Sequence, residues 1–247
     1  MQESIWLGFD SREVSAYAVA VHSIKSNLTR PIPINGLVLE DLQRHGLYTR
    51  PTKLYRDSEG NRQLIDVLSK RDDYDGAMST EFAISRFLVP HLAGSGWALF
   101  MDCDVLIRCD LSKLFALRDP SKAVQCVKHN YVPIQTVKMD GQIQTVYSRK
   151  NWSSFMLFNV DHPSNKKLTL DMVNALPGRD LHKFCWLADD EIGDLSVEWN
   201  WLAGESEPVA DPKVVHHTLG SPCLPGYEHA PFADEWRKSF MGWAVSP

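Results

Sequence analysis

Two aspartates lie within an apolar run in the segment Trp97-Ala-Leu-Phe-Met-Asp102-Cys-Asp104-Val-Leu-Ile107. The run follows the turn residues Gly94-Ser-Gly96 and predicts a central strand that is covered on both faces. Asp102 and Asp104 are two positions apart at the end of this strand, so their carboxylates project from the same face. Two negative charges at the mouth of an apolar sheet are costly without a counter-charge.

A divalent cation supplies that counter-charge. Hard oxygen ligands favour Mg²⁺ or Mn²⁺, and such an ion can bridge a diphosphate and neutralise the charge of a leaving group. We therefore predict a metal site at Asp102 and Asp104. A solvated turn, in which one of the two aspartates caps the chain, is the alternative interpretation.

A second polar segment is Val214-Val-His216-His217-Thr-Leu-Gly220, which overlaps a short expected strand over residues 213–218. Histidine is a common metal ligand, and Gly220 allows the backbone to approach a ligand closely. Either His216 or His217 can complete the metal shell. A purely structural histidine is the alternative.

Strand-like and helix-like segments alternate along the rest of the chain. Short apolar runs predict further strands over residues 5–9, 36–40, 123–127 and 155–160, and apolar residues at helical spacing predict helices over 14–24 and 79–90. Asp10 and Glu13 resemble a capping box at the first helix. The pattern predicts an α/β fold with a mixed, mostly parallel central sheet flanked by helices.

Three other segments carry weaker signals. Residues 41–76 are polar and predict a loop region. Asp140-Gly141 predicts a two-residue hairpin turn between two short strands. Residues from about 223 to 247 are rich in Pro, Gly and aromatics, and we expect them to form an irregular tail.

The composition excludes several classes of protein. The chain has 247 residues, of which 44% are hydrophobic and 23% charged, as in ordinary soluble domains, so we expect a single domain over residues 1–247. The net charge of −5 argues against a nucleic acid or an anionic membrane as the main partner. The five cysteines form no C-x-x-C pair, which disfavours a disulfide framework and favours a reducing compartment.

The amino-terminal segment predicts no targeting or transmembrane segment. It lacks a basic region, and the apolar run over residues 5–9 is too short for a signal peptide or a membrane span. We therefore expect a cytoplasmic location.

Together these segments resemble the DxD glycosyltransferases of the GT-A fold, and among them the family-8-like group that includes glycogenin and bacterial lipopolysaccharide sugar transferases. Residues 5–10 and the following helix are similar to the nucleotide-binding, Rossmann-like start of that fold. The resemblance continues, in the same linear order, through Ser85 to Pro90, Leu99 to Leu106, Trp152 to Asn159, Asp189-Asp190, Trp199-Asn-Trp201 and His216 to Gly220.

The resemblance implies retaining transfer of a sugar from a nucleotide diphosphate sugar, usually a UDP-sugar, to a hydroxyl of a glycan or another acceptor, with Mn²⁺ or Mg²⁺. The implied roles are metal ligation by Asp102, Asp104 and His216, base contacts by Phe9 and Asp10, donor contacts by Arg86 and Gly220, and contacts to the transferred sugar and acceptor by Asp190 with Asp189. Counting back from Gly220 favours His217 as the third ligand, but the strand pattern favours His216, which we prefer.

Each implied role has a simpler alternative. Asp10 can cap its helix, Arg86 can be a solvated surface charge, and the Asp189-Asp190 pair can be an exposed acidic turn.

The chain also departs from the family pattern. The family often carries Lys-Pro-Trp after the histidine strand, with the Lys stabilising the leaving diphosphate, whereas this chain has Ser221-Pro-Cys-Leu-Pro-Gly226. That role would fall to the metal, to Arg86, Arg149 or Lys150, or to backbone N–H groups near Gly220. Trp152-Ser-Ser154 replaces the usual Asn-Ser-Gly, and the segment after Asp190 is short for the family's helix.

Two other functions fit parts of the pattern. Haloacid-dehalogenase-type phosphatases also place D-x-D-x-[TV] after an apolar strand, with the first Asp as nucleophile and the second as general acid. In those enzymes the motif lies near the chain start, whereas here about 100 residues precede it. A catalytically inactive relative that binds a nucleotide or a glycan is the other alternative.

Overall fold

The computed structural model describes residues 2–56, 62–72, 74–129 and 149–245. Within these ranges the central sheet has the strand order β10-β8-β9-β6-β1-β2. β9 is antiparallel to β6 and β8, and the other neighbouring pairs are parallel, which confirms the predicted mixed, mostly parallel sheet. The strands are β1 (Glu3–Gly8), β2 (Ile34–Leu37), β6 (Trp97–Met101), β8 (Val124–Cys126), β9 (Phe155–Asn159) and β10 (Ile192–Asp194).

The apolar run that starts at Trp97 forms the middle of this sheet. All five residues of β6 are buried, as expected for a strand covered on both faces. Ala98 and Phe100 pack into one hydrophobic cluster, and Leu99 and Met101 pack into the other. The side chains therefore alternate between the two faces of the sheet.

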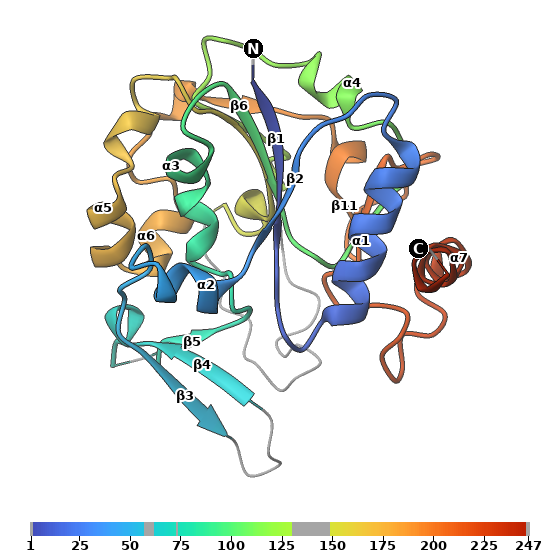
Figure 1. The fold of residues 1–247 in the computed structure, drawn as a ribbon, viewed down its shortest axis with the longest axis horizontal. Coiled ribbons are helices and arrows are strands. Elements are labelled where there is room, and N and C mark those ends of the chain that lie inside the picture. Colours follow the sequence, from blue (N-terminus) through green and yellow to red (C-terminus); the bar gives the residue numbers. More distant parts are fainter. Residues whose placement is uncertain (1, 57–61, 73, 130–148, 246–247) are drawn as a thin grey trace.

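Helices cover both faces of the sheet (Figure 1). α1 (Val14–Asn27) and α7 (Ala233–Ala244) lie on one side, and α2, α3, α5 and α6 lie on the other. The remaining α-helices are α2 (Leu39–Arg44), α3 (Val89–Ala93), α4 (Ser112–Phe115), α5 (Leu170–Ala175) and α6 (Gly178–His182). The 3-10 helices are η1 (Val67–Ser69), η2 (Ser85–Leu88), η3 (Trp152–Ser154), η4 (Asn165–Lys167), η5 (Asp189–Glu191) and η6 (Val197–Asn200).

A second sheet begins where the first ends. β7 (Val105–Ile107) directly follows the Asp102–Asp104 turn, and it pairs antiparallel with β12 (Val214–His216). β11 (Trp201–Leu202) pairs parallel with β12 and completes the order β11-β12-β7. In this register His216 lies opposite Val105, so the pairing carries the histidine to the aspartate turn.

The prediction of a loop over residues 41–76 is wrong. This segment contains part of α2 and the strands β3 (Thr52–Arg56) and β4 (Arg62–Asp66), which form an antiparallel sheet with β5 (Ala77–Met78). Figure 1 shows β3 and β4 projecting from the body of the molecule. Most of their side chains are therefore at least partly exposed, which removes the alternation of apolar and polar residues by which a half-buried strand is recognised.

Two further expectations are also wrong. The single helix expected over residues 79–90 is a 3-10 turn, η2, followed by α3, and Pro90 occupies the first turn of α3, where its missing N–H costs nothing. The tail expected to be irregular contains α7, which packs against α1 through the buried residues Trp236 and Ser239. The hairpin expected at Asp140-Gly141 lies outside the described residues.

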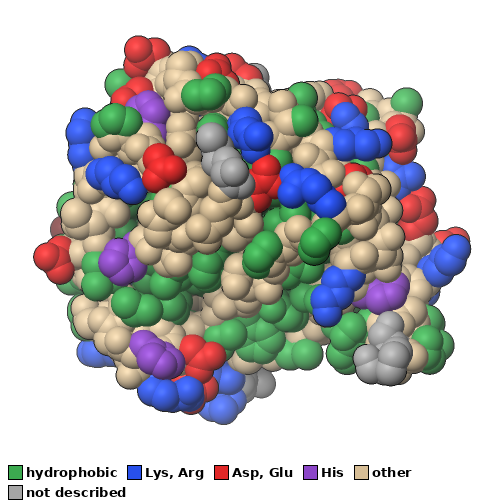
Figure 2. All heavy atoms as spheres, turned by 45° about the horizontal axis from the view of Figure 1, so that its top comes forward, with side chains coloured by type: hydrophobic (Ala, Val, Ile, Leu, Met, Phe, Trp, Pro, Cys, Tyr) green, Lys and Arg blue, Asp and Glu red, His purple; other side chains and the backbone are tan. Residues whose placement is uncertain are grey.

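The surface shows no separation of charge on the face that carries the amino ends of β1 and β6. Acidic and basic side chains are mixed over this face, with apolar side chains between them (Figure 2). Within the described ranges, none of the helices is both long and apolar enough to cross a membrane.

The Arg50–Asp66 ion pair generates a stability prediction. Both side chains are buried, and Arg50 also donates hydrogen bonds of 2.6 Å to the carbonyl groups of Val173 and Leu176. Asp66→Ala leaves the guanidinium buried without its carboxylate and should lower the free energy of unfolding by about 3–5 kcal/mol. Chemical denaturation measures this loss.

The exposed pair between Arg44 and Asp41 provides the matched control. Asp41→Ala should cost less than about 1 kcal/mol, because exposed ion pairs contribute little. Equal losses in the two variants would contradict the structural role of Asp66.

Candidate functional site

The candidate site lies at the carboxyl end of β6, in the turn that leads to β7. The N–H group of Asp102 donates to the carbonyl of Ser154, the residue directly before β9, at 3.0 Å. The carbonyl of Asp104 accepts from the N–H of His217 after β12, at 2.9 Å. Both ends of the turn are therefore fixed by neighbouring strands.

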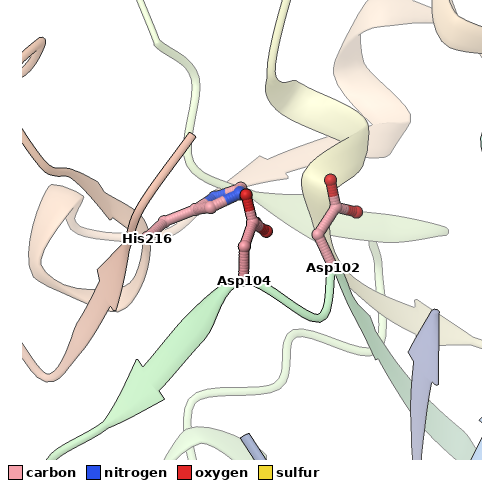
Figure 3. Close-up of side chains that lie close together, drawn as sticks. All are labelled: Asp102, Asp104 and His216. Atoms are coloured by element: carbon pink, nitrogen blue, oxygen red, sulfur yellow. Dashed lines mark ion pairs between the residues drawn. The ribbon is translucent and has the colours of Figure 1, made fainter. Parts of the chain in front are cut away.

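Asp102, Asp104 and His216 converge in this turn. Their ligand atoms all lie within 4.8 Å of one another, and His216 Nε2 is 2.9 Å from Asp104 Oδ1. Figure 3 shows the imidazole of His216 and the carboxylate of Asp104 pointing toward one another, with Asp102 beside them. Two carboxylates and one imidazole form a donor set that fits Mg²⁺ or Mn²⁺, and His216 is buried while the aspartates stay partly accessible.

His217 faces a different part of the structure. Its Nε2 lies 3.0 Å from the carbonyl oxygen of Pro231, and its backbone N–H donates to Asp104. The structure therefore brings the side chain of His216, rather than that of His217, to the two aspartates. Gly220 lies on the loop that follows, where its N–H donates to the carbonyl of His217 at 3.0 Å.

Arg86 is buried beside the aspartate turn. Its Nη1 is 2.8 Å from Asp102 Oδ1 and donates to the carbonyl of Ser153 at 2.9 Å. The guanidinium also lies over the rings of Phe82 and Phe100, at 5.2 and 5.0 Å from their centroids. The interpretation of Arg86 as a solvated surface charge is therefore wrong; the residue supplies a fixed positive charge to Asp102.

Asp10 is fully buried and connects the loop after β1 to residues 79–81. Its carboxylate accepts from Nε and Nη2 of Arg12 at 2.9 and 2.8 Å, and from the N–H of Glu81 at 3.0 Å. Burial acts to raise the pKa of Asp10, but the hydrogen bonds and charge of Arg12 outweigh it, so the pKa lies below its ordinary value. These contacts make Asp10 an anchor of the loop.

The capping box expected at the first helix is not formed. The Asp10 carboxylate accepts from the N–H of Arg12, and α1 begins only at Val14. Phe9, at the end of β1, is half-buried, and its ring meets that of Tyr17 edge-on at 5.2 Å.

The side chain of Glu13 turns toward the aspartate turn, a contact that sequence reasoning missed. Its Oε2 accepts a hydrogen bond from Cys103 Sγ at 3.1 Å. Burial, followed by the negative charge of Asp104, raises the pKa of Glu13 to about 7. The two partners are 90 residues apart, and the only sequence signal at Glu13 was its spacing from Asp10.

Asp189 and Asp190 are not brought to this site. They form η5 at the amino end of β10, and both are exposed. Strand register places the start of β10 level with Ala98, at the other end of β6 from Asp102. Asp189 pairs with Arg149, and the carbonyl of Asp190 accepts from Lys122. Their placement is that of the exposed acidic turn that was the alternative interpretation.

Asn200, His129 and His182 lie next to the site, and sequence reasoning missed them. Asn200 is hydrogen-bonded to both His216 and His129, and burial lowers the pKa of His129 to about 4. His182 Nδ1 is 2.7 Å from the hydroxyl of Ser153, and burial lowers the pKa of His182 to about 3. Only the short Trp199-Asn-Trp201 match pointed to any of these residues.

Comparison with solved structures defines the fold. The chain aligns over its full length with half of WbbM, a bifunctional glycosyltransferase, with a TM-score of 0.61 and 14% identity. It aligns over 99% of its length with 97% of an active-site mutant of LgtC, with a TM-score of 0.58 and 13% identity. GlyE, a glycosyltransferase of Streptococcus pneumoniae, gives a TM-score of 0.59 over 99% of this chain and 62% of GlyE. The chain therefore has the GT-A glycosyltransferase fold.

Comparison of sequences identifies the family. No family model matches the chain. Protein CDI of Arabidopsis thaliana is 42% identical over 238 residues, which cover 94% of this chain and 83% of that protein. The chain belongs to the family of Protein CDI.

The buried Asp10–Arg12 contact generates a pH-dependent prediction. Asp10→Asn should lower the free energy of unfolding at pH 7 by about 1.5–3 kcal/mol, because a charged hydrogen-bond acceptor is lost. A carboxyl whose pKa is lowered in the folded state stabilises the folded protein at pH values above its unfolded-state pKa of about 3.9. This stabilisation is lost as the pH falls through the pKa of the folded state. The gap between variant and wild type should therefore narrow in acid, as measured by urea denaturation across pH.

Asp234, whose side chain is fully exposed, provides the control. Asp234→Asn should change stability by less than about 0.5 kcal/mol. A gap for Asp10→Asn that stays constant down to low pH would contradict the role of its charge.

Proposed function

We propose that this protein is a metal-dependent glycosyltransferase that moves a sugar from a nucleotide diphosphate sugar, specifically a UDP-sugar, to a hydroxyl of a glycan or another acceptor, with retention of configuration. One observation carries the proposal: Asp102, Asp104 and His216 meet at the carboxyl end of the central strand in a chain with the GT-A fold. Carboxyl ends of parallel strands are the usual ligand side of open α/β sheets.

Asp102, Asp104 and His216 would hold Mn²⁺ or Mg²⁺. When bound, the ion supplies positive charge to the diphosphate of the donor and to the nucleotide diphosphate as it leaves. The protein's part is to keep these ligands in place before the ion arrives. Arg86 holds Asp102 from one side, and pairing of β12 with β7 holds His216 opposite.

The donor nucleotide would lie along the loop that follows β1. In this proposal the ring of Phe9 contacts the base, since Phe9 is half-exposed at the carboxyl end of its strand. The carboxylate of Asp10 already accepts hydrogen bonds from Arg12 and Glu81, so its contribution is to fix the loop that carries Phe9. A fixed loop reduces the conformational entropy lost when a ligand binds.

Stabilisation of the leaving diphosphate has to come from groups other than a Lys after the histidine strand. Of the candidates from the sequence, Arg86 is paired with Asp102, Arg149 is paired with Asp189, and the side chain of Lys150 is buried. The N–H of Gly220 already donates to His217. The proposal therefore assigns the largest share of this charge stabilisation to the metal.

An inactive relative that binds a nucleotide without turnover is the second candidate. The placement of Asp189 and Asp190 away from the aspartate turn favours it, because this pair was expected to face the transferred sugar. The phosphatase alternative rests on the D-x-D-x-[TV] pattern after an apolar strand, and the GT-A fold gives it no support.

The first prediction from this proposal concerns nucleotide binding. Calorimetric titration should show UDP binding with micromolar affinity in Mn²⁺ and no binding in EDTA. Asp104→Asn should weaken UDP binding more than about 100-fold. Substitution of a residue that only contacts a metal ligand already lowers metal affinity or activity about 10–100-fold, and Asp104 is itself a proposed ligand.

Asp194 provides the matched control, because it lies on β10 of the same sheet and its side chain is mostly exposed. Asp194→Asn should bind UDP like the wild type. Equal UDP affinity with and without EDTA would contradict the metal-dependent site. Tighter binding of GDP than of UDP would change the proposed donor class.

The second prediction concerns turnover. In Mn²⁺ the protein should release UDP from at least one UDP-hexose, and proton NMR of the product should show the anomeric configuration of the donor. An inverted product would contradict the retaining mechanism. Metal-dependent UDP binding without UDP release from any donor would support the inactive relative.

A further inference from the structure

The amide of Asn200 links three parts of the protein behind the metal-binding residues. Asn200 is fully buried at the end of η6. Its Oδ1 lies 2.9 Å from Nδ1 of His216, and its Nδ2 lies 3.0 Å from the hydroxyl oxygen of Ser154 and 3.1 Å from Nε2 of His129. A side-chain amide has one acceptor and two donors, and each is used here.

The direction of this amide follows from its neighbour Ser154. The Ser154 hydroxyl donates its only proton to the carbonyl of Asn151, at 2.7 Å. Its oxygen can then only accept from Asn200, so the Asn200 atom that faces it must be the NH₂ group. The carbonyl oxygen of Asn200 must therefore face His216.

The same reasoning fixes the tautomer of His216. Oδ1 of Asn200 carries no hydrogen, so Nδ1 of His216 must carry the proton in their hydrogen bond. In the neutral ring the lone pair then lies on Nε2, which is 2.9 Å from Oδ1 of Asp104. Two acceptors at this distance require a positive partner between them, either a proton or a metal ion.

We infer that Asn200 is a positioning residue that orients His216 and makes Nε2 its ligand atom for the metal. Asn200 does not touch the ion or a substrate, and it acts only through the ring of His216. The inference rests on the metal site of the proposed function. It adds the chain of hydrogen bonds from Asn151 through Ser154 and Asn200 that sets the ligand atom in advance.

The first test measures the binding of Mn²⁺ alone, without nucleotide. The electron paramagnetic resonance signal of the free ion reports how much Mn²⁺ remains unbound. Asn200→Ala should weaken Mn²⁺ binding about 10–100-fold, the usual effect of removing a group that orients a metal ligand. Asn200→Asp keeps an acceptor opposite Nδ1 of His216 and should lose less Mn²⁺ affinity than Asn200→Ala. Equal Mn²⁺ affinity in wild type and Asn200→Ala would overturn the inference.

Asn165 provides a matched control because it is also a buried asparagine with three hydrogen-bond partners, here the carbonyls of Ala123 and Asn159 and the indole of Trp186. Asn165→Ala removes comparable contacts at the end of β9 that lies away from Ser154, and it should keep the Mn²⁺ affinity of the wild type. A loss equal to that of Asn200→Ala would assign the effect to general destabilisation and overturn the positioning role.

The second test reads the tautomer directly and requires no metal. In the ¹⁵N-labelled wild type without metal, NMR should show a proton on Nδ1 of His216, whether or not Nε2 shares a second proton with Asp104. An Nδ1 that carries no proton would overturn the inference even if Asn200→Ala fails to fold. Absence of Mn²⁺ binding by the wild type, together with a proton on Nδ1, would contradict the proposed function and still support the orientation by Asn200.

Discussion

The whole site depends on the cost of placing two carboxylates at the edge of an apolar sheet. Asp102 and Asp104 follow a strand whose residues are all buried, so neither charge is stable there without a partner. Arg86 supplies one positive partner, and its guanidinium lies over the rings of Phe82 and Phe100. His216 supplies the other contact, and its strand must pair with β7 to reach Asp104. Much of the local architecture serves to bring these two side chains to the turn.

The main features of the fold could be predicted from the sequence because they follow from local patterns. The run from Trp97 to Ile107 is apolar on both faces, and burial makes such a run a central strand. The pair of strands β3 and β4 was missed because it projects from the body of the molecule. Solvent contacts both of its faces, so its sequence lacks the alternation of apolar and polar residues that marks a half-buried strand. Residues 79–90 were predicted to form one helix because periodicity alone does not separate a 3-10 turn from an α-helix.

The site could be predicted only where residues are close in the chain or on expected strand ends. Asp102 follows β6, Asp104 precedes β7 and His216 ends β12, and these strand ends meet at one edge. The partners of these residues could not be predicted, because the contacts of Glu13 with Cys103 and of Asn200 with His216 depend on packing between distant segments. Asp189 was misplaced because a match by linear order does not indicate at which end of a strand a turn lies.

The separation of Asp104 from His216 along the chain has a consequence during biosynthesis. About 110 residues separate the two, so a ribosome that adds 5–20 residues per second needs roughly 6–22 s to deliver the histidine after the aspartates. Until then β7 lacks its partner β12, and α1 lacks the cover of α7. The nascent chain therefore exposes the unpaired edge of β7 beside two acidic side chains. During this interval a chaperone has the largest exposed surface to protect.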